Sequence, residues 1–70
     1  MVIKIKIKNK FGEFTSKSMD ISDEDYINII ELSKDFYHSG YEMETEVGFV
    51  VIPPDLIKES ILIIEKHETT

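Results

Sequence analysis

The sequence lacks cysteine, tryptophan and arginine, and it has only three glycines and two prolines among its 70 residues. Without cysteine the chain can form neither a disulfide framework nor a cysteine-ligated zinc site. No apolar run exceeds four residues, far short of the roughly 18 that a membrane-spanning helix needs. The N-terminus also lacks the continuous apolar region of a signal peptide. We therefore expect a cytoplasmic protein that does not enter membranes.

A chain of 70 residues has room for one small domain, residues 1–70, and not for two. A domain of this size buries only about 60% of its unfolded surface, so its stability is marginal without further support. The sequence shows no disulfide or metal-ligand pattern that would supply it. Homo-oligomerisation therefore stays open as an additional source of stability.

The N-terminal part predicts two strands joined by a turn. Residues 2–9 alternate isoleucine with lysine, which is the period of a half-buried strand. Residues 13–20 follow a short turn and form a more polar stretch with weaker alternation. We expect a hairpin whose second strand lies at an edge or contains a bulge.

Residues 23–38 have the pattern of one amphipathic helix. Ser22 is suited to cap the first turn, three acids favour the positive end of the helix dipole, and Gly40 suits a left-handed C-terminal cap. Ile27 falls among polar residues, off the apolar arc. The arc itself consists of Tyr26, Ile29, Ile30, Leu32, Ser33, Phe36 and Tyr37.

The C-terminal part predicts further strands. Gly48 divides an alternating stretch into strands 41–46 and 49–52, either as a bulge or as a hairpin turn, and we prefer the hairpin. Residues 60–66 form a strand or the end of a helix that begins at Asp55. We prefer the strand, because a helix would leave Leu62 and Ile63 off its apolar stripe. Residues 68–70 are expected to be a frayed tail.

These elements predict an α+β fold with one amphipathic helix packed across an antiparallel sheet. Their order along the chain is ββαββ or ββαβββ, and the strands after Gly40 are expected to complete the sheet. The acids at 42, 44 and 46 repeat with the same period as the lysines at 4, 6 and 8. We expect the two rows to share one face of the sheet and form cross-strand ion pairs.

The charges are divided unevenly along the chain. Residues 1–18 hold five of the eight lysines and one acid, a net charge of +4, whereas residues 19–70 hold three lysines and thirteen acids, a net charge of −10. The surplus acids gather around the predicted helix, where a basic protein surface would be attracted to them. The candidate partner-binding residues are Asp20, Asp23, Glu24, Asp25, Glu31 and Asp35.

Nucleic-acid binding is the less favoured alternative, because the formal net charge is −6 and such domains are usually basic. Its candidate residues are Lys4, Lys6, Lys8, Lys10 and Lys17. A third alternative is a self-assembling structural subunit, suggested by the small core and the apolar run Ile61–Ile64.

The sequence shows no convincing catalytic or metal-binding set. No serine lies in a nucleophile elbow, and the three glycines form no phosphate-binding loop. We expect His38 and His67 to be solvated surface residues. Acids at 20, 23 and 25 lack the glycine and closing glutamate of a calcium loop. We expect no cofactor, no metal and no enzymatic activity.

The sequence therefore predicts a small, acidic, non-enzymatic protein-interaction module. Its short, arginine-free, Lys-, Ile- and Glu-rich composition is similar in style to small accessory proteins of phages with AT-rich genomes. The small size, the lack of a catalytic set and the strongly acidic second part suggest an inhibitor or regulator that binds a protein partner, of the viral accessory or counter-defence type.

Overall fold

The computed structural model describes residues 1–67 and confirms the α+β class. The tail expected over 68–70 lies outside these residues. The elements, in chain order, are β1 (Val2–Asn9), β2 (Gly12–Thr15), β3 (Met19–Asp20), α1 (Asp23–Ser33), α2 (Phe36–Ser39), β4 (Tyr41–Thr45), β5 (Gly48–Ile52), α3 (Pro54–Ile57) and β6 (Ile61–His67).

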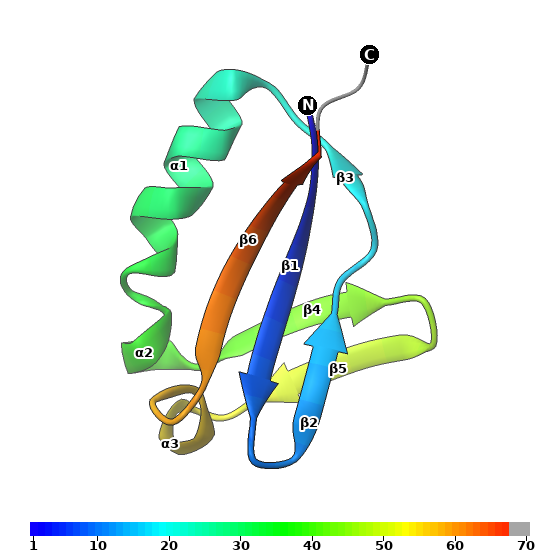
Figure 1. The fold of residues 1–70 in the computed structure, drawn as a ribbon. Coiled ribbons are helices and arrows are strands. Elements are labelled where there is room, and N and C mark those ends of the chain that lie inside the picture. Colours follow the sequence, from blue (N-terminus) through cyan, green and yellow to red (C-terminus); the bar gives the residue numbers. More distant parts are fainter. Residues whose placement is uncertain (68–70) are drawn as a thin grey trace.

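Strand β1 is the centre of the main sheet (Figure 1). It pairs antiparallel with β6 on one side and with β2 and β3 on the other. Its alternation is confirmed, because Ile3, Ile5 and Ile7 are at most 3% exposed. The intervening lysines point away from this buried row.

The second strand contains the bulge that its weak alternation left open. Thr15 lies opposite Lys6, but Met19 lies opposite Ile3, so three residues of this strand face two of β1. At the bulge, the amide of Ile5 donates to the hydroxyl of Ser16 at 2.8 Å. The amide of Lys17 leaves the main sheet and donates to the carbonyl of Glu44 on β4 at 3.1 Å. The bulge therefore links the main sheet to the rest of the fold.

Strands β4 and β5 form a separate two-stranded sheet, which confirms the preferred hairpin. The turn is at Glu46 and Val47, and the hydroxyl of Thr45 closes it by donating to the carbonyl of Gly48 at 2.7 Å. The strands after Gly40 therefore do not all complete one sheet, since only β6 joins β1.

The prediction that the lysine and glutamate rows share one face of a sheet is wrong, because the hairpin is not part of the sheet of β1. The lysines at 4, 6 and 8 lie on β1, and the acids at 42 and 44 lie on the hairpin, in a different sheet. Equal spacing sets which face of its own strand a side chain occupies, but it does not specify the neighbouring strand.

The single helix expected over 23–38 is wrong in one respect, because it divides into α1 and α2 at Lys34 and Asp35. The hydroxyl of Ser33 donates to the carbonyl of Ile30 at 2.6 Å. The amides of Lys34 and Asp35 then bond three residues back instead of four, which tightens and ends the α-helix.

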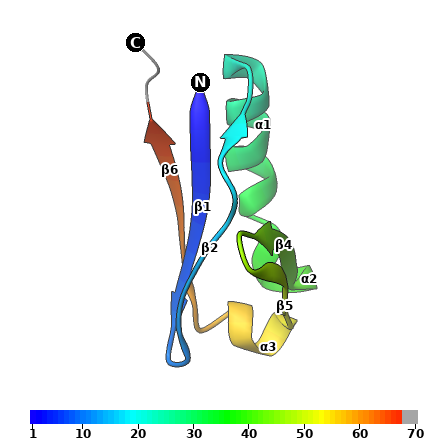
Figure 2. The same ribbon diagram turned by 90° about the vertical axis from the view of Figure 1, so that its right-hand side faces the viewer.

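The packing of α1 is also looser than expected. No side chain of α1 is fully buried, and Leu32, on the predicted apolar arc, is 61% exposed. The helix lies beyond the β6 edge of the main sheet instead of across its middle (Figures 1 and 2). Ile27 is 59% exposed, in agreement with its place off the apolar arc.

The fold has two layers, with the main sheet on one side and the hairpin and all three helices of residues 1–67 on the other (Figure 2). Between them lies a core of five buried side chains: Ile5, Ile7, Met43, Ile52 and Ile57. The preferred reading of residues 55–66 is confirmed, because short α3 is followed by strand β6. Within residues 1–67, none of the helices has the length and apolar character needed to cross a bilayer.

Candidate functional site

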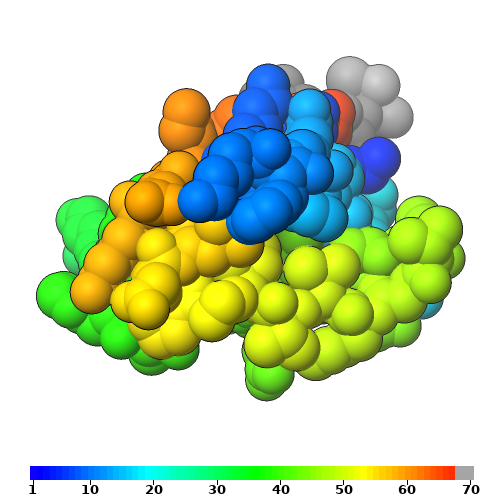
Figure 3. Space-filling model, turned by 90° about the horizontal axis from the view of Figure 1, so that it is seen from below, coloured from blue at the N-terminus to red at the C-terminus, as the bar shows by residue number. Residues whose placement is uncertain are grey.

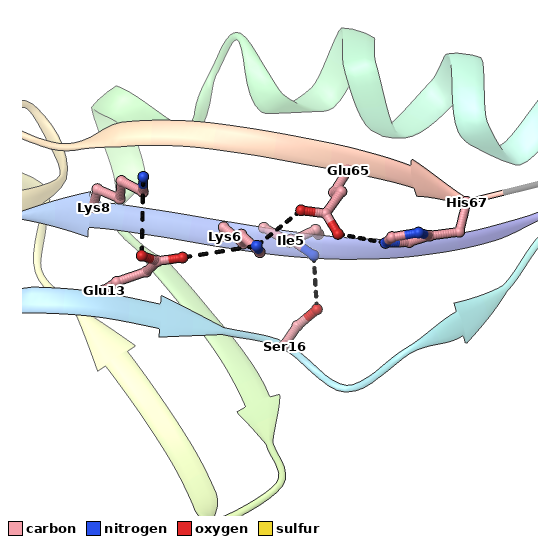
Figure 4. A network of polar contacts seen from close by, with 7 residues as sticks. All are labelled: Ile5, Lys6, Lys8, Glu13, Ser16, Glu65 and His67. Carbon is pink, nitrogen blue, oxygen red and sulfur yellow. Dashed lines mark hydrogen bonds and ion pairs between the residues drawn. The ribbon is translucent and has the colours of Figure 1, made fainter.

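Lys6 and Lys8 of β1 lie on the uncovered face of the main sheet, in a network with acids of the neighbouring strands (Figure 4). The ammonium of Lys6 is 2.8 Å from Glu65 and 3.8 Å from Glu13, and that of Lys8 is 3.9 Å from Glu13. The hydrogen bond from Lys6, followed by the contact with His67, lowers the pKa of the Glu65 carboxyl. This face therefore carries both signs of charge.

The remaining predicted nucleic-acid-binding lysines also lie near acids. Lys10 is 3.6 Å from Glu59, and Lys17 is 3.0 Å from Glu44. Lys4 is directly opposite Glu65 in the register of β1 and β6. The basic segment of the sequence thus folds into a charge-compensated surface rather than a positive patch.

The six acids predicted to bind a partner are all exposed, but they do not form one patch. Three of them, Asp23, Glu24 and Asp25, occupy the first turn of α1, where the hydroxyl of Ser22 accepts from the amide of Asp25. The other acids lie outside this turn. Asp20 is 3.4 Å from the N-terminal ammonium, Glu31 is 3.2 Å from Lys34, and Asp35 precedes α2. With a rise of about 1.5 Å per residue, the acids of α1 alone extend over about 12 Å from Asp23 to Glu31.

A more concentrated surface lies on the outward side of the hairpin. Glu42 is opposite Val51 and Glu44 is opposite Phe49, so these four side chains share one face, while Met43 points into the core. We call the hairpin face the surface made by Glu42, Glu44, Phe49 and Val51 together with Glu46 and Val47 of the turn. It combines a row of acids with a parallel row of apolar side chains.

The apolar row of the hairpin face is strongly exposed. Val47, Phe49 and Val51 are 99%, 63% and 66% exposed. The turn of the hairpin projects beyond α3 and the β1–β2 turn (Figure 3). Single exposed apolar residues such as Phe11 are ordinary, whereas a row of them on a projecting element is a candidate interaction surface.

An open hollow of about 600 Å³ continues the hairpin face at its base. Glu42 and Val51 belong to both, and the hollow is further lined by Phe36, Tyr41 and the two prolines that follow β5. The rings of Phe36 and Tyr41 lie 4.3 Å apart between centroids. Burial raises the pKa of the Tyr41 hydroxyl above its ordinary value.

The sequence contained a signal for the hairpin face that we did not use. If the turn is at Glu46 and Val47, then Glu42 and Glu44 define the outward side of β4. Their direct partners on β5 must share that side, so Phe49 and Val51 are necessarily outward as well. The strand pairing therefore predicts an exposed aromatic residue that a hydrophobicity pattern alone would assign to the core.

The described residues 1–67 contain no group of three His, Cys, Asp or Glu side chains placed to hold a metal ion. Comparisons with protein-family models, with curated proteins and with solved structures each find no match.

Proposed function

We propose that this protein is a small interaction module that binds a basic protein surface through the hairpin face. One observation carries the proposal: Val47, Phe49 and Val51 form a solvent-exposed apolar row beside a row of glutamates on a projecting hairpin. Burying apolar area supplies about 25 cal/mol per Å². An aromatic residue near the middle of such a surface is a common source of binding energy.

The acids of the hairpin face favour a partner whose contact surface is positively charged. Of its three glutamates, Glu44 has a lysine neighbour, Lys17 at 3.0 Å. The net charge of −6 attracts a cationic protein over distances of about 10 Å at moderate ionic strength. The acids first predicted around α1 fit this proposal as a source of steering, while the hairpin supplies the contact.

The proposed mode of action requires no chemistry on the partner. A module that covers a basic surface blocks whatever that surface would otherwise bind, and this is how an inhibitor or regulator would use it. Glutamate and the apolar row together disfavour nucleic acid as the ligand, because phosphates are repelled by carboxylates.

Photo-crosslinking tests the proposed function. We would replace Phe49 with p-benzoylphenylalanine, and Ile27 in a matched control, because the two side chains are 63% and 59% exposed and lie on different elements. Irradiation in an extract of the source cells should give a discrete protein adduct from position 49. The same adduct should be absent from position 27, and its yield should fall as the salt concentration rises.

Two patterns of adducts would overturn the proposal. One is an equal set of adducts from positions 49 and 27, which would mean non-selective contact. The other is an adduct from position 49 that disappears after nuclease treatment, which would mean that nucleic acid is the ligand. Absence of any adduct at position 49 would likewise count against the hairpin face.

A further inference from the structure

The hollow at the base of the hairpin is lined mainly by apolar and aromatic residues. Phe36 and Tyr41 supply aromatic surface, and the prolines at 53 and 54 supply rigid apolar surface. Its volume of about 600 Å³ falls within the range of about 300–1,000 Å³ that is typical of ligand sites.

The backbone at Gly40 fixes the shape of this hollow. Gly40 has φ +77°, and a Cβ at this position would lie 2.7 Å from the carbonyl oxygen of Ile52 and 3.1 Å from Cδ of Pro54. The end of α2 can therefore approach the end of β5 only because residue 40 is a glycine. The two segments that bring Tyr41 and Pro54 together are in direct contact.

Charge decides which ligand the hollow fits. Of the nine described residues that line it, only Glu42 is charged, and Glu42 is exposed. An apolar, aromatic site with a single carboxylate at its side matches a long side chain that is apolar along its stem and cationic at its end. Arginine fits best, because its planar guanidinium stacks on rings and pairs with a carboxylate in a bidentate manner.

We infer that the hollow between α2, β4 and the prolines after β5 is the specificity pocket for an arginine side chain of the partner. This inference rests on the proposed function, since it names the residue that the hairpin face would receive. Phe36 and Tyr41 hold the stem and the guanidinium plane, and the Glu42 carboxylate accepts hydrogen bonds from the guanidinium. The apolar row along β5 contacts the residues that flank this arginine.

A titration with a small probe tests the pocket without the partner. N-acetyl-arginine amide would be added to the ¹⁵N-labelled protein, with N-acetyl-citrulline amide as the uncharged isostere. We expect saturable amide shifts at Gly40, Tyr41, Glu42 and Val51 for the arginine probe only. An affinity in the millimolar range is expected for so small a ligand.

Two charge-matched variants locate the binding. Glu42→Gln removes the carboxylate of the pocket, and Glu46→Gln removes one at the turn, outside the residues that line the hollow. Glu42→Gln should weaken binding of the arginine probe by roughly two- to fivefold, the range for an exposed ion pair. Glu46→Gln should leave it unchanged, and both variants should keep the amide spectrum of the folded protein.

Equal amide shifts for the two probes would overturn the inferred arginine pocket. So would an equal loss of probe affinity in both variants. So would an arginine probe that causes no saturable shifts at these amides. Such a failure leaves the crosslinking result at position 49 intact, and the hairpin face would then bind without this pocket. Conversely, the probe could bind in the pocket while position 49 gives no selective adduct. That combination would overturn the proposed function and leave the pocket standing.

Discussion

Ser16 holds the bulge at which the main sheet approaches the hairpin, where it forms an isolated bridge with Thr45. Its hydroxyl accepts from the amide of Ile5 at 2.8 Å and donates to the carbonyl of Lys17 at 3.0 Å, while its own amide donates to the carbonyl of Ile5. The side chain thus replaces a missing backbone partner at the bulge. Because Ser16 is only 5% exposed, water cannot easily take over this role.

Replacing Ser16 with alanine should therefore destabilise the fold. The Ser16→Ala variant leaves the buried amide of Ile5 without its acceptor, and we expect a loss of about 1–3 kcal/mol in the free energy of unfolding. Ser18→Ala, at an exposed position of the same bulge, is the control and should change it by less than about 0.5 kcal/mol. Urea unfolding of the three proteins measures both values, and equal effects would remove the assigned role of Ser16.

Glu65 makes the stability of the fold depend on pH. The hydrogen bond from Lys6 lowers the pKa of its carboxyl in the folded state. A lowered pKa contributes stability above the unfolded value of about 4.3, and that contribution is lost as the pH falls through the folded value. In Lys6→Met the midpoint of the Glu65 titration, followed by NMR of the carboxyl carbon, should rise. An unchanged midpoint would show that Lys6 is not the cause.

At the scale of elements, local sequence patterns predicted the individual helices and strands better than they predicted which strands lie side by side. The alternation in β1, the cap at Ser22 and the hairpin around Gly48 each depend on residues close in the chain, and each is found. The hairpin turn itself is at Glu46 and Val47, just before the expected position at Gly48. Which of the later strands lies beside β1 is not specified locally, because any strand with a compatible face satisfies the same alternation. Strand β6 takes that place, while β4 and β5 form a separate sheet. The bulge at Ser16 is a register shift between β1 and its neighbour, and such a shift is not visible in a single strand.

The candidate site was missed for a related reason. Six acids around α1 were conspicuous as a run of charge, whereas Phe49 and Val51 have the composition of a buried strand. Their exposure follows from the cross-strand register with Glu42 and Glu44. The helix was likewise predicted as one element, because periodicity continues through Lys34 and does not show the hydrogen bond by which Ser33 ends α1.

The contact between α2 and β5 should be sensitive to a single methyl group. Gly40→Ala adds a Cβ that would lie 2.7 Å from the Ile52 carbonyl oxygen, whereas a Cβ at Gly48 meets nothing within 4 Å. Both glycines have positive φ, so both variants carry backbone strain of about 1–3 kcal/mol. Gly40→Ala should lower the thermal midpoint more than Gly48→Ala does. The reverse order would contradict the close approach that shapes the hollow.

At the scale of the whole molecule, the two layers differ in charge. The main sheet pairs Lys6 and Lys8 with Glu13 and Glu65 on the uncovered face, so positive charge of the N-terminal segment is compensated there. The second layer, made of the helices and the hairpin, retains the acidic surplus and the exposed apolar row. Folding thus converts an asymmetry along the chain into an asymmetry between two sides of the molecule. The acidic, apolar side is the one that we assign to the partner.

The most direct test of this assignment uses the partner identified by cross-linking at position 49. Its affinity is measured for the unaltered chain, for Phe49→Ser and for a double variant at α1. Phe49→Ser should weaken binding at least about tenfold, as loss of a central aromatic contact does. Glu24→Gln/Asp35→Asn, which removes two exposed acids near α1, should weaken it less than about threefold, and high salt should abolish that smaller difference. If the double variant at α1 abolishes binding while Phe49→Ser leaves it unchanged, the hairpin face is not the binding surface.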